Sequence, residues 1–370
     1  MKKRYKVLGS LALLLVVAAG ILGAVMSHES PCASPPPIAA GTTRMKAILQ
    51  RCYGAPEILR LDEVEKPVPG EHEIRVRVHA ASVNPLDWHV MRGEPYIMRM
   101  QAGIGAPKVS RFGADFSGSV EAVGKSVTRF KPGDEIFGDK RGAFAEYLSI
   151  PDDRPLALKP ANITHEQAAA VPIAAVTALQ ALRDKALIKP GQKLLINGAS
   201  GGVGTFAVQI AKQLGAEVTA VCSGRNAELV RSLGADHVVD YTKEDITRSG
   251  QQFDAIVDTV GNRALLDMRR IMKPSGNFVI VGGPSDGPWI GAMVMPIKAA
   301  FISPFVKQDF KFFLADVNQK DLDYLAGLMQ SGKLTSVIDR RYPLAEVPQA
   351  IAYLEEGHAR GKVVITVLNP

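Results

Sequence analysis

The fold of this chain is decided by the stretch Lys193-Leu194-Leu195-Ile196-Asn197-Gly198-Ala199-Ser200-Gly201-Gly202-Val203-Gly204. It begins as a short apolar strand at 193–197, passes through a turn of small residues, and enters an amphipathic helix at 203–214. A second strand follows at 217–222. This spacing of strand, glycine turn, helix and strand is typical of the unit that binds a dinucleotide.

The turn places small residues where a dinucleotide needs them. Ala199, Gly201 and Gly204 fall at the first, second and third glycine positions of the fingerprint, with alanine in the first. Small residues keep the turn tight, let the backbone approach the pyrophosphate and let the helix pack on its strand. The first N–H groups of the helix then face the phosphates. The predicted diphosphate-binding residues are Ala199, Ser200, Gly201, Gly202, Val203 and Gly204, and a purely structural turn is the alternative.

The end of the second strand indicates which dinucleotide binds. NAD-preferring sites usually place Asp or Glu there, which accepts from the ribose 2′-hydroxyl. This chain has Ser223 and Arg225 instead, and both can donate to a 2′-phosphate. The sequence therefore favours NADPH over NADH. The alternative is that Arg225 is an ordinary solvated loop residue.

Length, charge and cysteine usage limit the class of protein. The chain has 370 residues, which is enough for two domains with substantial cores. Four basic residues before residue 7 supply much of the net charge of +7, and the rest of the chain has no basic runs, which argues against a nucleic-acid partner. The three cysteines, Cys32, Cys52 and Cys222, are far apart and indicate neither a disulfide framework nor a cysteine zinc site.

The N-terminal segment differs in composition from the rest of the chain. Val7–Met26 carries no charge and would be about 30 Å long as a helix, enough to cross a bilayer. We therefore expect a single-pass membrane anchor at 1–26, with a cleaved signal peptide as the alternative. Residues 27–44 are rich in proline and predict a stiff, extended spacer. The basic flank places the body on the far side of the membrane, whereas use of NADPH favours the cytosol, so the side is left open.

The region from 45 to 166 predicts a compact β-rich domain. Ile74, Val76 and Val78 alternate with charged residues, as in a half-buried strand, and glycines punctuate the run from 113 to 138.

Several motifs in this region carry a family resemblance. Gly113-Ala114-Asp115-Phe116-Ser117-Gly118, with the segments at 120–124 and 130–134, resembles the medium-chain dehydrogenase/reductase superfamily. Asn84-Pro85-Leu86-Asp87 and the turn at 199–204 are similar to its quinone oxidoreductase branch. The resemblance covers 45–370. It implies an α/β fold with a GroES-like β-rich catalytic domain at 45–166, a Rossmann domain with a doubly wound parallel sheet at 167–317, and a return to the first domain at 318–370.

The resemblance also predicts that no metal is bound. Zinc-dependent relatives hold a catalytic zinc with thiolate, imidazole and carboxylate ligands, but Asn84 stands where they place Cys and Ala114 where they place His. Asp115 alone cannot hold zinc. Without a Lewis acid, oxidation of an unactivated alcohol is difficult. A quinone or an α,β-unsaturated carbonyl compound needs less help, because it accepts hydride from nicotinamide C4 and then only a hydrogen bond or a proton.

The resemblance nominates three catalytic residues, each with a plainer alternative. Asn84 would lie at the nicotinamide end of the site, although Asn-Pro is also a common turn pair. His89 stands where related quinone reductases carry a Tyr, and the alternative is an ordinary core or surface histidine. Tyr96 is displaced by one residue from a second family Tyr, with Pro95 at the matching position.

Further cofactor-binding residues follow from the same resemblance. Thr177 would lie against the nicotinamide, or else bond its own helix backbone. Tyr241 would lie beside the 2′-phosphate, or else be an ordinary strand-end aromatic. Gly261, Gly282 and Gly283 would line the cofactor at two later strand ends. Lys362 matches a C-terminal family motif and receives no role.

The C-terminal third predicts how subunits and domains join. The segment 310–314 resembles the family strand that pairs between subunits, so we expect a homodimer. Strands at 332–338 and 363–367, with a helix at 346–356 between them, would return to the first domain.

The sequence thus predicts an NADPH-dependent, zinc-independent oxidoreductase, anchored to a membrane, that reduces quinones or enones. Two alternatives remain: a non-catalytic NADPH-binding redox sensor at the membrane, and an enoyl-thioester reductase.

Overall fold

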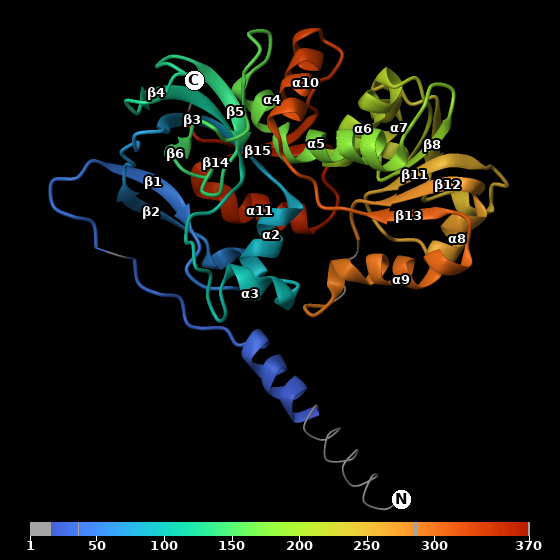
Figure 1. Cartoon of the computed structure of the whole chain (residues 1–370), viewed down its shortest axis with the longest axis horizontal. Coiled ribbons are helices and arrows are strands. Elements are labelled where there is room, and N and C mark those ends of the chain that lie inside the picture. Colours follow the sequence, from blue (N-terminus) through green and yellow to red (C-terminus); the bar gives the residue numbers. More distant parts are fainter. Residues whose placement is uncertain (1–15, 36, 284–286, 369–370) are drawn as a thin grey trace, which may run out of the picture.

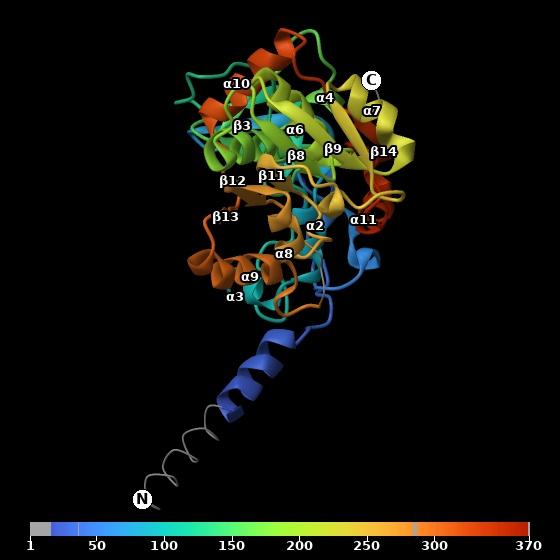
Figure 2. The same cartoon turned by 90° about the vertical axis from the view of Figure 1, so that its right-hand side faces the viewer.

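The computed structural model describes residues 16–35, 37–283 and 287–368. Two sheets lie side by side, and a helix near the N-terminus projects from one end of the molecule (Figure 1). A view from the side shows the same arrangement and places α3 (Arg99–Ala102) and α9 (Val294–Ile302) at the end from which this helix projects (Figure 2).

The six-stranded sheet has the order β10-β9-β8-β11-β12-β13, and every neighbouring pair is parallel. The chain winds outward from the centre in both directions, first through β8, β9 and β10 and then through β11, β12 and β13. This confirms the predicted doubly wound Rossmann sheet. Its strands are β8 (Lys193–Asn197), β9 (Glu217–Cys222), β10 (His237–Asp240), β11 (Phe253–Asp258), β12 (Met272–Ile280) and β13 (Asp309–Phe312).

Helices cover both faces of this sheet, which explains why its strands are continuous apolar runs. Leu194, Leu195 and Ile196 of β8 are fully buried. One face packs against α5 (Pro172–Gln180), α6 (Gly202–Gln213), α7 (Ala227–Ser232) and α10 (Gln319–Gln330). The other packs against α8 (Leu265–Arg270) and α9 (Val294–Ile302).

The second sheet is mostly antiparallel and forms the β-rich domain that the sequence predicts to be GroES-like. Its order is β14-β15-β3-β4-β5-β7, with β6 paired to β3. Ile74, Val76 and Val78 are fully buried on β3 and alternate with more exposed arginines. Its elements are β3 (Glu73–Val83), β4 (Asp115–Val123), β5 (Glu135–Asp139), β6 (Tyr147–Pro151) and β7 (Leu156–Leu158), with the separate pair β1 (Arg44–Leu49) and β2 (Arg60–Glu65).

The C-terminal segment returns to this β-rich sheet. β15 (Lys362–Thr366) pairs with β3, and β14 (Ile338–Pro343) pairs with β15. The helix α11 (Val347–Glu355) connects them. The strand expected at 332–338 is wrong in position: it begins at Ile338, because the preceding residues form a turn and an irregular segment after α10.

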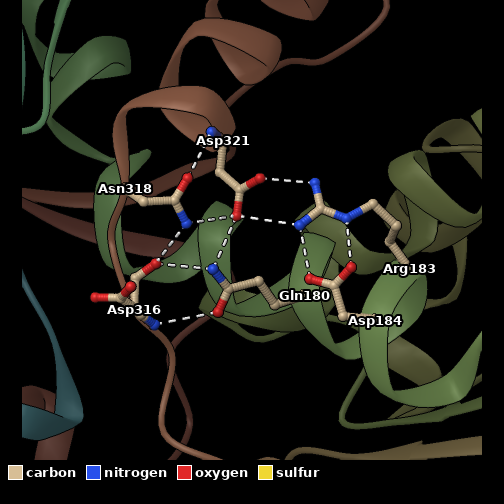
Figure 3. Close-up of polar contacts among 6 residues, drawn as sticks. All are labelled: Gln180, Arg183, Asp184, Asp316, Asn318 and Asp321. Carbon is tan, nitrogen blue, oxygen red and sulfur yellow. Dashed lines mark hydrogen bonds and ion pairs between the residues drawn. The ribbon is translucent and has the colours of Figure 1, made fainter.

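A polar network fixes α10 onto the end of α5 (Figure 3). Asp321 is buried and accepts hydrogen bonds from Gln180 Nε2 at 2.8 Å and Arg183 Nη1 at 2.6 Å. Asn318 caps α10 by accepting from the Asp321 backbone at 3.0 Å. The side chains of Gln180, Arg183, Asn318 and Asp321 all have hydrogen-bond partners within this network, so we assign it a structural role.

The structure corrects the prediction of an N-terminal transmembrane helix. Within 16–35, 37–283 and 287–368, no helix has both the length and the apolar character that a membrane crossing requires. Residues 7–15 of the proposed span lie outside the described residues. The described helix covers 16–27, so the single-pass anchor and the membrane localisation that depended on the span are not supported.

The interpretation that the spacing of the cysteines gives no sign of a disulfide is also corrected. Cys32 and Cys52 form a disulfide, with Cα atoms 4.6 Å apart, and Cys222 is free and buried. Twenty residues separate the two half-cystines in sequence, which gave no local signal for the pairing. The disulfide fastens the proline-rich N-terminal segment to the loop after β1.

Candidate dinucleotide and acceptor site

The glycine turn lies at the point where the winding of the parallel sheet reverses. It follows β8, and the neighbouring strand β11 belongs to the other half of the sheet. Ligands of open α/β sheets bind beyond the carboxyl ends of the strands at this switch point. The topology thus places residues 198–204 and 258–261 together at the expected position.

Three glycines of this turn have different reasons to be glycine. Gly198 has φ +82°, and a Cβ there would collide with Thr259 Oγ1. A Cβ on Gly204 would collide with the carbonyl oxygen of Gly198, so the close packing of α6 requires this glycine. Gly201 differs, because its φ of −81° and ψ of 179° suit any residue and its Cβ would meet only the Gly198 oxygen, at 3.4 Å. The fold does not require glycine at 201, which leaves close approach of a ligand as its physical reason.

Asn226 connects the turn to the end of β9, and sequence reasoning missed it. Its side chain is buried and donates to Ser200 Oγ at 2.9 Å and to Ser223 Oγ at 3.2 Å. The two predicted binding residues, which lie more than twenty positions apart, are therefore held in one arrangement. The only sequence signal for Asn226 was its place three residues after Ser223.

Asp258 organises the loop after β11. Its Oδ1 accepts from Asn197 Nδ2 at 2.8 Å and from the backbone N–H of Gly261, also at 2.8 Å. Burial raises the pKa of Asp258, and among the described residues its Oδ2 has no hydrogen-bond partner. Asp258 holds Gly282, which follows the next strand β12, in the same place, since the Gly282 N–H donates to the Asp258 carbonyl at 3.2 Å. Gly261 and Gly282 therefore both bond to Asp258.

One residue that the sequence reasoning overlooked lies beside the end of β9, on the neighbouring strand β10. Arg225 is exposed and Tyr241 is 43% exposed, so both are open to a ligand. Asp240, from the end of β10, packs its carboxylate against Gly224, between Ser223 and Arg225. Hydrogen bonds from Thr242 lower the pKa of Asp240, so this carboxylate is ionised at neutral pH. A negative group therefore lies beside the predicted 2′-phosphate position.

A fully buried polar cluster lies next to the glycine turn. Lys362 Nζ donates to Asn84 Oδ1 at 2.5 Å and to the Val83 carbonyl at 3.1 Å. Asn84 Nδ2 donates to Asp115 Oδ2 at 2.9 Å, and the Lys362 ammonium is 3.9 Å from the same oxygen. A Cβ on Gly202 would lie 3.2 Å from Lys362 Cδ, so the lysine chain runs against the first turn of α6.

The cluster holds two carboxyl groups and one ammonium away from water. Asp87 accepts from the Asn84 backbone N–H at 2.7 Å, in the capping box that begins α2 (Pro85–Arg92). Burial raises the pKa of Asp87 to about 7 and that of Asp115 to about 6. Burial also lowers the pKa of Lys362. The native cluster thus retains protons, between about pH 4 and pH 7, that the unfolded chain releases.

This set of side chains does not fit a zinc ion. An amide, two carboxyl groups and an ammonium converge here, and the ammonium would repel a divalent cation. Asp115 instead accepts from Ser82 Oγ at 3.1 Å and from the Ile173 backbone N–H at 3.2 Å, at the start of α5. In the described part of the chain, no three His, Cys, Asp or Glu side chains are grouped so that they could hold a metal.

Replacement of Lys362 by Met is expected to lower the free energy of unfolding at pH 7.5 by about 3 kcal/mol, because it leaves buried carboxylates without their cation. The loss should shrink at pH 5.0, where Asp87 and Asp115 hold their protons. Urea denaturation followed by circular dichroism at both pH values measures this. Lys298→Met, at an exposed position of α9, is the control. An equal loss at both pH values would show that the cluster carries no such charge.

The remaining predicted site residues fall into two groups. Thr177 bonds its own helix through Oγ1 to the Ile173 carbonyl at 2.6 Å, and Ile173 connects it to Asp115 and Asn84. His89 is turned to the Glu94 carbonyl at 2.9 Å and stacks on Trp88, and burial lowers the pKa of His89.

Tyr96 belongs to a different set of contacts. It lies in the short helix η2 (Tyr96–Met98), and its backbone N–H donates to the Pro288 carbonyl at 2.7 Å. Its ring meets Trp289 edge to face, with centroids 5.0 Å apart. The structure connects Asn84 with Thr177 and Lys362, but Tyr96 and His89 contact neither Asn84 nor each other by hydrogen bonds among the residues described here.

Comparison with known proteins finds relatives that match most of the chain. Residues 70–161 match the alcohol dehydrogenase GroES-like domain family, and residues 233–365 match the zinc-binding dehydrogenase family. The mitochondrial NAD(P)H oxidoreductase RTN4IP1 of Mus musculus is 35% identical over 366 residues, which cover 89% of this chain and 91% of the mouse protein. The 2-methylene-furan-3-one reductase of Solanum lycopersicum is 32% identical over 87% of this chain and 79% of its own length.

A solved structure shows the same fold. The quinone oxidoreductase from Coxiella burnetii superposes with a TM-score of 0.76 at 31% sequence identity, covering 88% of this chain and 100% of that chain.

Proposed function

Because this chain belongs to the medium-chain dehydrogenase/reductase superfamily, in its zinc-independent quinone oxidoreductase-like branch, we propose that it reduces quinones or α,β-unsaturated carbonyl compounds with NADPH and without a catalytic metal. It is an oxidoreductase of the medium-chain type that uses a nicotinamide cofactor. The observation that carries the finer proposal is the contact of Lys362 with the first turn of α6, which puts an ammonium-centred cluster beside the dinucleotide turn.

The cofactor is held by the carboxyl edge of the parallel sheet. The N–H groups that begin α6, from Ser200 to Gly204, receive the diphosphate, since the free N–H groups and the helix dipole favour an anion there. Ser223, Arg225 and Tyr241 surround the 2′-phosphate. Gly261, Gly282 and Gly283 flank the chain of the nucleotide, and Thr177 lies toward its nicotinamide end.

NADPH supplies a hydride from C4 of its nicotinamide. The protein fixes where that hydride goes by holding the loop of Asn84 rigid. Both ends of the Asn84 amide are engaged, with Lys362 on its oxygen and Asp115 on its nitrogen, so Asn84 acts as a positioning residue. This modifies the sequence-based hypothesis that its amide orients the substrate directly.

The acceptor is a flat conjugated carbonyl compound. Relatives are named for quinones and for a 2-methylene-furan-3-one, which both carry a carbonyl conjugated to a carbon–carbon double bond. Such acceptors take hydride without a Lewis acid, and their oxygen then needs only a proton. Tyr96 is the aromatic side chain that we assign to the acceptor end, and His89 is tied to Glu94 instead.

We also propose a division into units and an assembly. The GroES-like unit spans 45–166, the Rossmann unit 167–317 and the return 318–370. β13 is an edge strand of the six-stranded sheet, and Leu314 just beyond it is 83% exposed. A second copy that adds its own β13 to this edge would extend the sheet and form a homodimer.

The proposed function is tested by NADPH oxidation with a panel of quinones, enones and simple alcohols or ketones. We expect turnover with quinones or enones, and we expect a metal chelator to leave its rate unchanged. Turnover confined to simple alcohols, or lost on treatment with chelator and restored by zinc, would contradict the proposal.

A second candidate is a non-catalytic NADPH-binding redox sensor. The Cys32–Cys52 disulfide favours it, as does the engagement of Asn84 and His89 in internal hydrogen bonds. Tight binding of NADPH with no turnover of any carbonyl acceptor in the same panel would select this candidate.

A further inference from the structure

The residues 26–32, which we call the strap, are docked on the protein body. Met26 is only 4% exposed, and the Ser30 backbone N–H donates to the Gly105 carbonyl at 2.9 Å. The strap ends at the Cys32–Cys52 disulfide. The proline content of 27–44 predicts a stiff, extended spacer, and these contacts of the strap with the body were not predicted.

The strap completes the hydrogen bonding of a buried arginine. Arg99, which begins α3 (Arg99–Ala102), has no exposed surface, and a guanidinium has five N–H donors. Two of its hydrogen bonds, both at 2.9 Å, go to the Arg92 and Gly93 carbonyls at the end of α2. The other three go to the strap: the Met26 carbonyl at 3.2 Å, the His28 carbonyl at 3.1 Å and Glu29 Oε1 at 2.9 Å.

Loss of the strap would therefore remove the protein partners of three N–H donors of this cation. A charged donor that loses its partner costs free energy unless water replaces that partner. The guanidinium would then turn toward the water that takes the place of the strap. The position of Arg99 is thus conditional on the strap.

Two aromatic rings pack against this guanidinium. Arg99 Cζ lies 4.4 Å from the centre of the Tyr53 ring and 4.2 Å from the centre of the Tyr96 ring. Tyr53 directly follows Cys52, and its hydroxyl donates to the Gly103 carbonyl at 2.8 Å. The disulfide, Tyr53, Arg99 and Tyr96 thus form one continuous set of contacts.

The same set reaches the Rossmann side of the molecule. Tyr96 bonds Pro288 through its backbone and meets Trp289 edge to face. The N-terminal helix also comes close to Trp289, since a Cβ on Gly23 would lie 3.4 Å from its ring. Both cartoon views place this helix against the end of the molecule that holds α3 and α9 (Figures 1 and 2).

We propose that the strap is a working part of the acceptor site: Glu29 and Arg99 are positioning residues for Tyr96, and the Cys32–Cys52 disulfide keeps them in place, so that reduction of the disulfide weakens binding of a flat conjugated acceptor. The inference rests on the proposed function in one respect, namely that Tyr96 contacts the acceptor. Arg99 acts through Tyr96 and not on the reacting atoms.

The redox step is a thiol–disulfide exchange with a dithiol. Cys32 is exposed, so a dithiol can attack the disulfide from solvent. One thiolate of the dithiol bonds to a cysteine sulfur, the Cys32–Cys52 bond breaks, and the second thiolate closes the dithiol into its own disulfide. The protein gains two electrons and two protons and ends with two thiols. Without the cross-link the strap gains conformational entropy when it leaves the body, and this opposes its hydrogen bonds with Arg99.

The test compares the full-length protein before and after reduction with dithiothreitol, which is removed by gel filtration before assay. A thiol count of three per unfolded chain instead of one verifies the reduction. We expect the KM for a naphthoquinone to rise about tenfold on reduction, while the KM for NADPH changes less than about twofold. Cys32→Ser should show the high KM in both conditions. An unchanged naphthoquinone KM after verified reduction would overturn the proposal.

A second measurement does not depend on turnover. The chain has two tryptophans, so Trp88→Phe leaves Trp289 as the only indole. We expect its fluorescence maximum to shift to longer wavelength when the disulfide is reduced. If no acceptor is turned over but this shift occurs, the proposed function fails and the strap coupling stands. If turnover occurs and the naphthoquinone KM does not change after verified reduction, the strap proposal fails whatever the fluorescence shows.

A matched pair of charge variants separates the ion pair from general surface effects. Glu29→Gln removes the carboxylate that faces Arg99, and Glu63→Gln removes one that pairs with Arg44 on the exposed β1–β2 strands. We expect a rise of about threefold in the naphthoquinone KM for the first variant, with kcat retained, and no change for the second. Equal effects from both would contradict the assignment of Glu29 as a positioning residue.

Discussion

Gly201→Val is expected to abolish NADPH binding while the protein remains folded. The backbone at 201 is extended, and a Cβ there meets only the Gly198 oxygen at van der Waals distance. The fold therefore has room for a Cβ at this position. The bound diphosphate does not, because it must approach this backbone closely. We expect the Kd for NADPH to rise by about 100-fold or more, with the melting temperature within about 3 °C of the parent protein.

Two other glycines serve as controls for this result. Gly204→Val should destabilise the protein itself, because its side chain would collide with the carbonyl of Gly198 inside the helix–strand contact. Gly327→Val, in α10, has open space around it and should affect NADPH binding little. Isothermal titration and thermal denaturation measure both quantities. If Gly201→Val binds NADPH with unchanged affinity, the diphosphate does not lie on this turn.

Arg225→Glu is expected to reverse the cofactor preference. The exposed guanidinium can form charge-assisted hydrogen bonds with a 2′-phosphate, and a carboxylate in its place would repel that group. We expect the KM for NADPH to rise about 100-fold and the KM for NADH to stay within about threefold. Steady-state kinetics with both cofactors and one acceptor measure the switch.

The carboxylate of Asp240 leads to a prediction in the opposite direction, toward NADPH. It packs against Gly224 between the two predicted phosphate ligands, and it is ionised at neutral pH. Asp240→Asn should therefore improve NADPH relative to NADH. If the parent protein prefers NADH and Arg225→Glu changes nothing, then Asp240 plays the part of the ribose-binding acid and the assignment of NADPH is wrong.

Local sequence patterns predicted the Rossmann half well. The strand expected at 217–222 is β9 residue for residue, and the helix expected at 203–214 is α6 within one residue at each end. Such elements are encoded by periodicity and by turn glycines that lie close together in sequence. The order of strands in the sheet follows from the same units, because parallel connections are short and right-handed.

Two contacts that the sequence reasoning missed join residues far apart in the chain. Lys362 meets Asn84 across 278 positions, and Arg99 meets Glu29 of the strap across 70. No periodic pattern reports such contacts. Asp240 was not predicted, because the ribose-binding acid is usually found at the end of β9. The neighbouring parallel strand β10 ends at the same edge of the sheet and places Asp240 there. The N-terminal apolar run was judged by hydropathy alone, which does not show that Met26 and the residues after it dock on the body.

The disulfide also changes what the cysteine content implies. Disulfides persist mainly in oxidising environments. The chain couples one to a site that we assign to redox-active acceptors, so the state of Cys32 and Cys52 would report the same conditions that generate those acceptors.

The central claim is hydride transfer from NADPH to an activated carbonyl compound by a protein that uses no metal ion. Its most direct test is a reaction of NADPH deuterated at nicotinamide C4 with an enone, using protein whose metal content has been measured by mass spectrometry. We predict one deuterium on the β-carbon of the saturated product, formed by protein with far less than one metal ion per chain. Deuterium on the carbonyl carbon of an alcohol product, or activity that rises in proportion to bound zinc, would contradict the account.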